Sequence, residues 1–150
     1  MIFGNLVEYR PPRIAMSLVL VAVAAHLTIG LPLHNGMPVA AAIVASIGLA
    51  MMLRAWWLFR LARTAICPTE TATSLITHDV FSLSRNPMYL GLTLMLAGFA
   101  LAIGTLPFYL AAITYFVAMD RAFCPYEEGK SLQEFGGEYE AYTRRVHRWL

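Results

Sequence analysis

Two long stretches of the sequence contain no charged residue. Residues 14–53 and 86–119 lack Asp, Glu, Lys and Arg altogether, which gives uncharged runs of 40 and 34 residues. Only 13% of the chain is charged, whereas a soluble domain carries about 25%. One membrane-spanning helix needs roughly 20 apolar residues, so each run can supply two. The scarcity of charge therefore argues against an ordinary soluble domain and predicts an integral membrane protein.

The uncharged runs predict an all-α fold with four transmembrane helices arranged as two hairpins. We expect one membrane domain over residues 1–150, with an N-terminal hairpin (1–63) and a core (64–150). The second helix should continue to residue 63, and Cys124-Pro125 should end the fourth, because proline interrupts a helix. The first run is too long for the apolar part of a cleaved signal peptide. The predicted spans are residues 14–31, 39–53, 87–103 and 107–119.

Cysteine is also scarce. The chain has two cysteines, Cys67 and Cys124, and four histidines, and these residues show no metal-ligand spacing. The sequence therefore predicts neither a disulfide nor a metal site. His26 lies inside the first span, where it either packs through a hydrogen bond or has a function.

Basic residues are absent from both predicted hairpin turns, 32–38 and 104–107. All eleven Lys and Arg residues fall on the side that holds the two termini and the central loop. The positive-inside rule places that side, and any active site on it, in the cytoplasm. The net charge of +2 favours membrane lipids with anionic headgroups as partners rather than nucleic acid.

The stretch from Ser84 to Gly91 carries the only charge between the polar loop and the second uncharged run. Pro87 fits the first turn of a helix, where its missing N–H costs nothing. Asn86 before it is a good N-cap. Arg85 should therefore stand at a helix mouth, beside backbone N–H groups that can bind an anion. The alternative is that Arg85 only anchors the topology.

The C-terminal tail has an amphipathic helical pattern. Its apolar residues recur at steps of three and four, and Gly136-Gly137 predicts a break or kink. The tail either lies on the membrane or closes over the Arg85 mouth as the lid of a cofactor pocket. The apolar stripe consists of Leu132, Phe135, Tyr139, Tyr142, Val146 and Trp149.

Glu127 and Glu128 are adjacent carboxylates after the fourth span. On a regular helix they face about 100° apart. Glu128 is seven residues before Phe135 and so lies on the inward stripe, which suits it to bind an ammonium group. Glu127 is expected to reach solvent or Arg121. With Arg85 opposite, the pair suits a zwitterionic ligand.

Three sequence blocks together resemble the isoprenylcysteine carboxyl methyltransferase family, which is related to the phospholipid N-methyltransferases. The similarity covers about residues 66–150 and includes Pro68 and Leu75-Ile76-Thr77 in the lead-in loop. The blocks are Arg85-Asn86-Pro87-Met88-Tyr89-Leu90-Gly91, the pair Glu127-Glu128, and Phe135-Gly136-Gly137-Glu138-Tyr139-Glu140-Ala141-Tyr142 with Arg145-Val146-His147-Arg148-Trp149-Leu150.

The resemblance implies a membrane-embedded methyltransferase that uses S-adenosylmethionine and a lipophilic acceptor, such as an isoprenylcysteine carboxylate or a related lipid. It gives Arg85, Glu128 and Tyr89 catalytic roles. A thiol or amine acceptor would need a base, for which His78 and Asp79 are candidates. The cofactor-binding residues that it implies are Arg85, Asn86, Pro87, Tyr89, Gly91, Glu127, Glu128, Tyr139, Tyr142 and Arg145.

Two other classes stay open at this point. A sterol-type membrane reductase has a similar Arg-x-Pro-x-Tyr-x-Gly block and binds NADPH. A non-enzymatic membrane protein would use the same residues only as helix caps and anchors. Binding of S-adenosylmethionine, of NADPH or of neither separates the three classes.

Overall fold

A computed structural model describes residues 11–64 and 72–150, and the elements found there are helical. The predictions for Cys67 and Pro68 concern residues outside these two ranges. The elements are α1 (Pro11–Ile29), α2 (Pro38–Ala62), the 3₁₀-helix η1 (Asp79–Ser82), α3 (Pro87–Ile103), α4 (Leu106–Ala118), the π-helix η2 (Met119–Phe123), α5 (Cys124–Phe135) and α6 (Gly137–Thr143).

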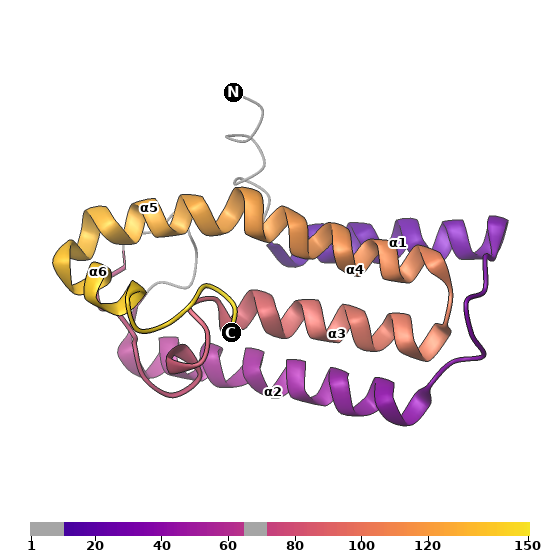
Figure 1. The fold of residues 1–150 in the computed structure, drawn as a ribbon, viewed down its shortest axis with the longest axis horizontal. Coiled ribbons are helices and arrows are strands. Elements are labelled where there is room, and N and C mark those ends of the chain that lie inside the picture. Colours follow the sequence, from indigo (N-terminus) through magenta and orange to yellow (C-terminus); the bar gives the residue numbers. More distant parts are fainter. Residues whose placement is uncertain (1–10, 65–71) are drawn as a thin grey trace.

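Four long helices run side by side, but not in the order of two simple hairpins. α2 packs on α3, α3 packs on α4, and α4 packs on α1 (Figure 1). The predicted pairing of the first two spans is therefore wrong, because α3 and α4 lie between them. The connection after α1 instead runs along the α3–α4 turn, where the N–H groups of Leu33 and Met37 donate to the carbonyls of Gly104 and Leu101, each at 2.8 Å.

Small residues allow the closest helix contact, between α2 and α3. A Cβ atom placed on Gly91 would lie 2.5 Å from the carbonyl oxygen of Gly48, and one on Gly98 would lie 2.8 Å from the Cβ of Ala45. Such distances are too short for any side chain, so glycine permits the two backbones to meet. Glycine at these positions therefore sets how closely α3 approaches α2.

The outer faces of α1 and α2 are apolar. Leu20, Leu27 and Val39 are 66%, 77% and 73% exposed, which is unusual for large apolar side chains in water but suits lipid. By length and composition α1 and α2 can each cross a membrane, whereas α3 is shorter, with 17 residues. These apolar outer faces indicate membrane association.

His26 in α1 makes an edge contact with Phe108 at 6.0 Å between ring centroids.

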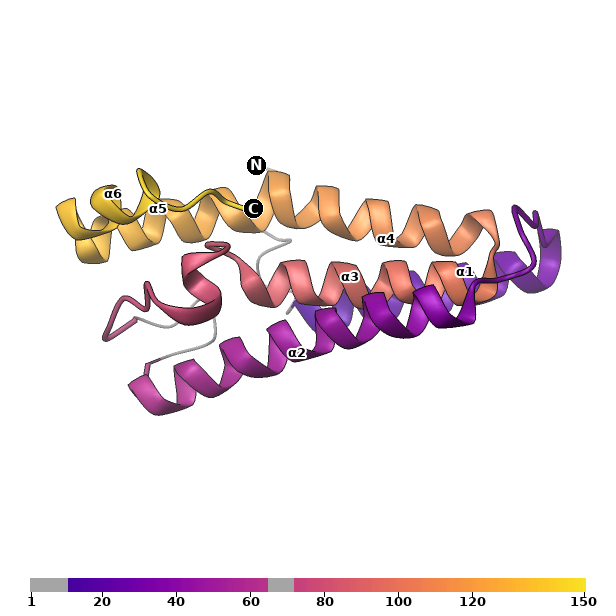
Figure 2. The ribbon, with the colours of Figure 1, turned by 60° about the horizontal axis from the view of Figure 1, so that its bottom comes forward.

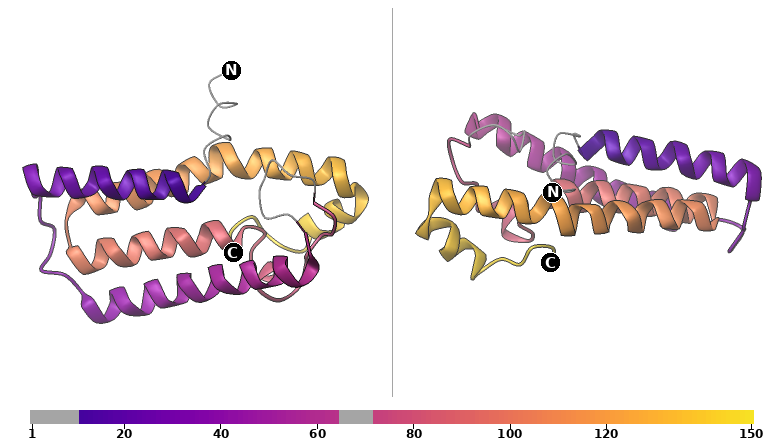
Figure 3. Two further views of the ribbon diagram at one scale, coloured as in Figure 1. Left: turned by 180° about the vertical axis from the view of Figure 1, so that it is seen from behind. Right: turned by 90° about the horizontal axis from the view of Figure 1, so that it is seen from above.

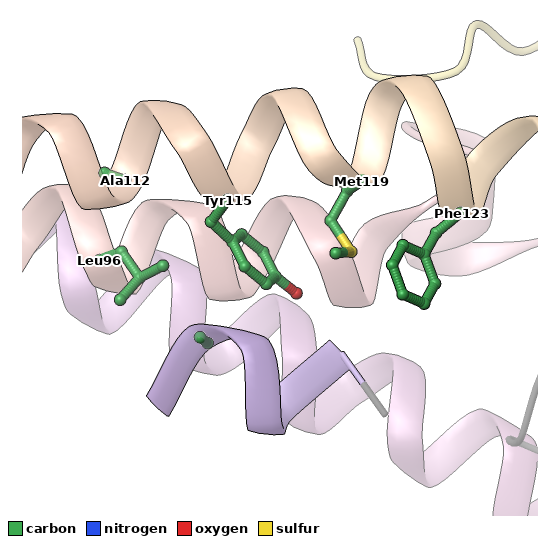
Figure 4. Close-up of a cluster of buried hydrophobic side chains, with 6 residues drawn as sticks. Leu96, Ala112, Tyr115, Met119 and Phe123 are labelled. Carbon is green, nitrogen blue, oxygen red and sulfur yellow. The ribbon is translucent and has the colours of Figure 1, made fainter. Parts of the chain in front are cut away.

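Pro125 does not end the fourth helix. α4 passes through η2 directly into α5, so the prediction of a helix end at Cys124-Pro125 is wrong. Proline inside a helix clashes with the carbonyl four residues earlier, and the wider π-turn that precedes Pro125 gives room for it. Four residues of this segment form a buried cluster with Leu96 of α3 (Figure 4): Ala112, Tyr115, Met119 and Phe123.

The tail extends past the bundle and then folds back. Figure 2 shows α5 and α6 beyond the end of the bundle where α3 begins. Gly136, at φ +50°, separates the two helices, which confirms the break predicted at Gly136-Gly137. α6 ends at Thr143, and residues 144–150 return toward the start of α3 (Figure 3). The tail thus lies over the α3 mouth rather than only on a lipid surface.

Candidate active site at the α3 mouth

Arg85 stands just before α3 and faces the tail. Its Nη2 lies 3.0 Å from Oε1 of Glu128, and its Nη1 donates to the hydroxyl of Tyr139 at 3.3 Å. Its backbone N–H donates to the carbonyl of His147. The guanidinium Nε is buried and has no partner among the described residues. The side chain therefore keeps one unused donor in the site.

Asn86 occupies the N-cap position without capping the helix through its side chain. Its Nδ2 donates instead to the carbonyl of Arg148 at 3.3 Å. The hydroxyl of Ser84 donates to the same carbonyl and accepts the N–H of Asn86. The side chain of Asn86 therefore does not form the predicted helix cap. It binds the returning tail instead, because the carbonyl of Arg148 is an acceptor within reach.

Glu128 lies between two arginines. Its Oε1 pairs with Arg85, and its Oε2 lies 2.6 Å from Nη2 of Arg148. Arg148 also contacts Asp120 at 3.0 Å, and the indole N–H of Trp149 donates to the same carboxylate. These two donors hold the pKa of Asp120 below its usual value. The charge of Glu128 is therefore already balanced within the site.

Glu127 takes a different position from the one predicted. The hydroxyl of Tyr89 donates to its carboxylate, whereas Arg121 is 79% exposed and pairs with Asp120. The expectation that Glu127 reaches solvent or Arg121 is wrong, because the π-turn changes the phase between α4 and α5. Burial raises the pKa of Glu127 to about 7, although the hydrogen bond from Tyr89 and the charge of Lys130 act in the opposite direction.

Two cavities meet beside Arg85. The larger has a volume of about 330 Å³, at the lower end of the 300–1,000 Å³ typical of ligand pockets, and the smaller of about 130 Å³. The larger runs between α2, α3 and α4, whereas the smaller extends toward α5 and α6. The residues that line both are Phe59, Phe81, Arg85, Asn86 and Glu127.

The remaining residues implied by the resemblance divide into two groups. Pro87 and Tyr89 line the larger cavity, and Tyr139 and Tyr142 line the smaller. Tyr142 also donates to the carbonyl of Phe81 at 2.6 Å, which fixes α6 against η1. The other group contributes to neither cavity wall within the described residues: Gly91 packs on Gly48, and Arg145 bonds to the carbonyl of Ala141 at the surface.

The two candidate bases lie apart from these cavities. Asp79 forms an ion pair of 2.6 Å with Arg54, whose guanidinium holds the pKa of Asp79 below its usual range. Asp79 and His78 are not among the described residues that line either cavity. Glu127 is the carboxylate that both cavities share.

A family model described as phospholipid methyltransferase matches residues 37–137. The chain belongs to the phospholipid methyltransferase family. That match spans α2 to the start of α6 and so includes the Arg85 mouth and the Glu127-Glu128 pair.

Two rice relatives, from Oryza sativa subsp. indica and subsp. japonica, are named as probable protein-S-isoprenylcysteine O-methyltransferases. Each is 34% identical over 84 residues, which is 54% of this chain and 42% of the relative. The chain thus spans about two-fifths of the length of the curated relatives that it matches. No solved structure matches the chain.

Sequence reasoning missed Arg148 and Tyr115. Arg148 lies beyond α6, which ends at Thr143, so a helical pattern in the tail cannot predict where its side chain points. Tyr115 lies in an uncharged run where nothing distinguishes it from a core aromatic. The one usable signal for Arg148 was the nearby surplus of carboxylates at Asp120, Glu127 and Glu128.

Proposed function

We propose that this protein is a membrane-embedded methyltransferase that uses S-adenosylmethionine and acts on a lipophilic acceptor. The observation that carries the proposal is the meeting of two cavities at Arg85, Asn86 and Glu127. One cavity is open to polar groups of the tail, and the other lies among apolar side chains of the helix bundle. Two substrates of different polarity could therefore meet at this point, and family membership supports methyl transfer between them.

The residues at the junction suit the polar part of the cofactor. The buried Nε of Arg85, which lacks a partner among the described residues, matches a carboxylate, for which arginine is the preferred partner. Among the described residues no arginine pairs with Glu127, so its carboxylate suits the positive charge of an ammonium or sulfonium. Tyr139 and Tyr142 would form the far wall of the smaller cavity. When bound, S-adenosylmethionine supplies an activated methyl group.

The role of the chain would be to align the two substrates and to exclude water. An in-line methyl transfer needs little from side chains beyond this alignment. Arg85 would hold the cofactor, Tyr89 would orient Glu127, and the returning tail would cover the site. The Glu128–Arg148 pair would position Arg85 rather than bind the ligand, because Glu128 is already neutralised.

An isoprenylcysteine carboxylate is the acceptor that the names of the rice relatives suggest. A carboxylate acceptor needs no general base, which agrees with the position of Asp79 in an ion pair at the surface. An aminophospholipid is the other acceptor class that the family name suggests, and it would have to react as the neutral amine.

Ligand binding to the purified protein tests the proposal. We expect retention of radiolabelled S-adenosylmethionine, displaced by S-adenosylhomocysteine, and no retention of NADPH. With labelled donor, mass spectrometry of lipid extracts should then reveal the methylated acceptor. Retention of NADPH instead would support a reductase, and retention of neither ligand would support a non-enzymatic protein.

We also propose that α1 to α4 all cross the membrane, with both termini and the site in the cytoplasm, because the basic residues gather on that side. In a background without the two native cysteines, Cys at the exposed position Asn35 should react with an impermeant maleimide from outside. Cys at the exposed position Glu138 should react only after the membrane is opened. Reaction of both from one side would contradict this topology.

A further inference from the structure

Tyr115 places a hydroxyl group within a cluster of buried apolar side chains. Its side chain is fully buried, with an exposed fraction of 0%, and its hydroxyl has no hydrogen-bond partner among the described residues. Figure 4 shows the ring pointing from α4 into the bundle, with the oxygen turned toward the side of Met119. Tyr115 also lines the larger cavity.

A buried hydroxyl without a partner is costly, at about 1–3 kcal/mol, so this group calls for an explanation. The other tyrosine of the cavity, Tyr89, donates its hydroxyl to Glu127 and is therefore occupied. Met52, Phe59 and Leu92 line the same cavity and offer no strong side-chain acceptor for an O–H group, and the carboxylate of Glu127, which also lines it, accepts the hydroxyl of Tyr89 instead. A ligand in the cavity could supply one.

We propose that the hydroxyl of Tyr115 hydrogen-bonds an oxygen of the lipophilic acceptor inside the larger cavity. This inference rests on the proposed function and names the acceptor class more closely. The acceptor would carry an amide, ester or ether oxygen near its reacting group, in addition to its apolar chain. Tyr115 would then select such molecules over those whose chain is plain hydrocarbon at the same place. It would position the acceptor without taking part in methyl transfer.

Two lipid probes and one isosteric variant test this assignment. N-acetyl-S-farnesylcysteine carries an amide oxygen, and S-farnesyl-3-mercaptopropionate has the same tail and carboxylate without the amide. Wild-type protein should bind the first probe about threefold to tenfold more tightly, the value of one neutral hydrogen bond. Tyr115→Phe should remove this preference, because it should weaken binding of the amide probe and leave binding of the other probe unchanged. Its thermal stability should be equal or higher, because the buried hydroxyl is gone.

Tyr109→Phe provides the matched control. Its hydroxyl bonds His34 at 2.7 Å at the opposite end of the bundle, so both probes should bind this variant as they bind wild type. Affinity for S-adenosylhomocysteine should be the same in all three proteins. If wild type does not bind S-adenosylhomocysteine, that result counts against the proposed function and not against the assignment of Tyr115. The assignment is overturned if wild type does not bind the amide probe, or if Tyr115→Phe keeps the preference for it.

Discussion

Arg85→Ala should weaken binding of S-adenosylmethionine by roughly 10- to 150-fold, the value of one charge-assisted hydrogen bond of about 1.5–3 kcal/mol. The side chain is 15% exposed, so water cannot replace the guanidinium well. It also contacts Glu128 and Tyr139, and its removal would disturb the tail as well. Equilibrium dialysis with labelled ligand would measure the loss.

Arg85→Lys tests whether Arg85 binds the ligand or only anchors the membrane topology. Lysine keeps the positive charge but replaces a planar fork with a point charge, so it should restore only part of the affinity. Arg63 offers a control, since it caps α2 at the same end of the molecule and lines neither cavity within the described residues. If both Arg85 variants bind the ligand as Arg63→Ala does, Arg85 is only a topology anchor.

Glu127→Gln should also cost about 10- to 150-fold in affinity, and Glu128→Gln should cost less. The sequence analysis predicted that Glu128, not Glu127, binds the ligand's ammonium group, because a regular helix would point Glu128 inward. In the structure Glu128 is already paired with Arg85 and Arg148, whereas the carboxylate of Glu127 accepts a hydrogen bond from the neutral Tyr89 and has no arginine partner among the described residues. Titration of the ligand into both variants would decide between them.

Loss of Glu128 should appear mainly as lost stability. Removing one partner of a buried ion pair costs about 3–5 kcal/mol, and the cost here should be smaller because Glu128 and Arg148 are 21% and 30% exposed. Thermal unfolding in detergent should therefore show a larger decrease for Glu128→Gln than for Glu127→Gln. A greater loss of ligand affinity at Glu128 would restore the assignment made from sequence.

The raised pKa of Glu127 gives the site a pH dependence with a definite sign. Its folded value, about 7, lies above the ordinary 4.5, so its contribution to folding stability falls as pH rises from about 4.5 to about 7. A cationic ligand prefers the ionised carboxylate, so ligand affinity should rise with pH while the contribution of Glu127 to folding stability falls. From pH 6 to pH 8 the ionised fraction increases about tenfold, and Glu127→Gln should abolish that rise in affinity.

The sequence could predict the helices because their signals are local. The second uncharged run and Pro87 place α3 at its observed bounds. The order of helices in space could not be predicted, because it depends on which apolar faces fit together. The roles of Glu127 and Glu128 depend on a single π-turn, for which the sequence carries no periodic signal, and Arg148 lies beyond the last helix.

If α4 crosses the membrane as proposed above, the unbroken passage from α4 through η2 into α5 links the site to the thickness of the bilayer. α4 has 13 residues, about 20 Å at 1.5 Å per residue, against a hydrocarbon layer of about 30 Å. A thinner bilayer would fit it with less strain, and a thicker one would change its tilt. Because Glu127 lies on α5, which continues directly from α4, such a tilt would move it relative to Arg85, which lies just before α3. Lipid chain length would thus act on the chemistry without any regulatory ligand.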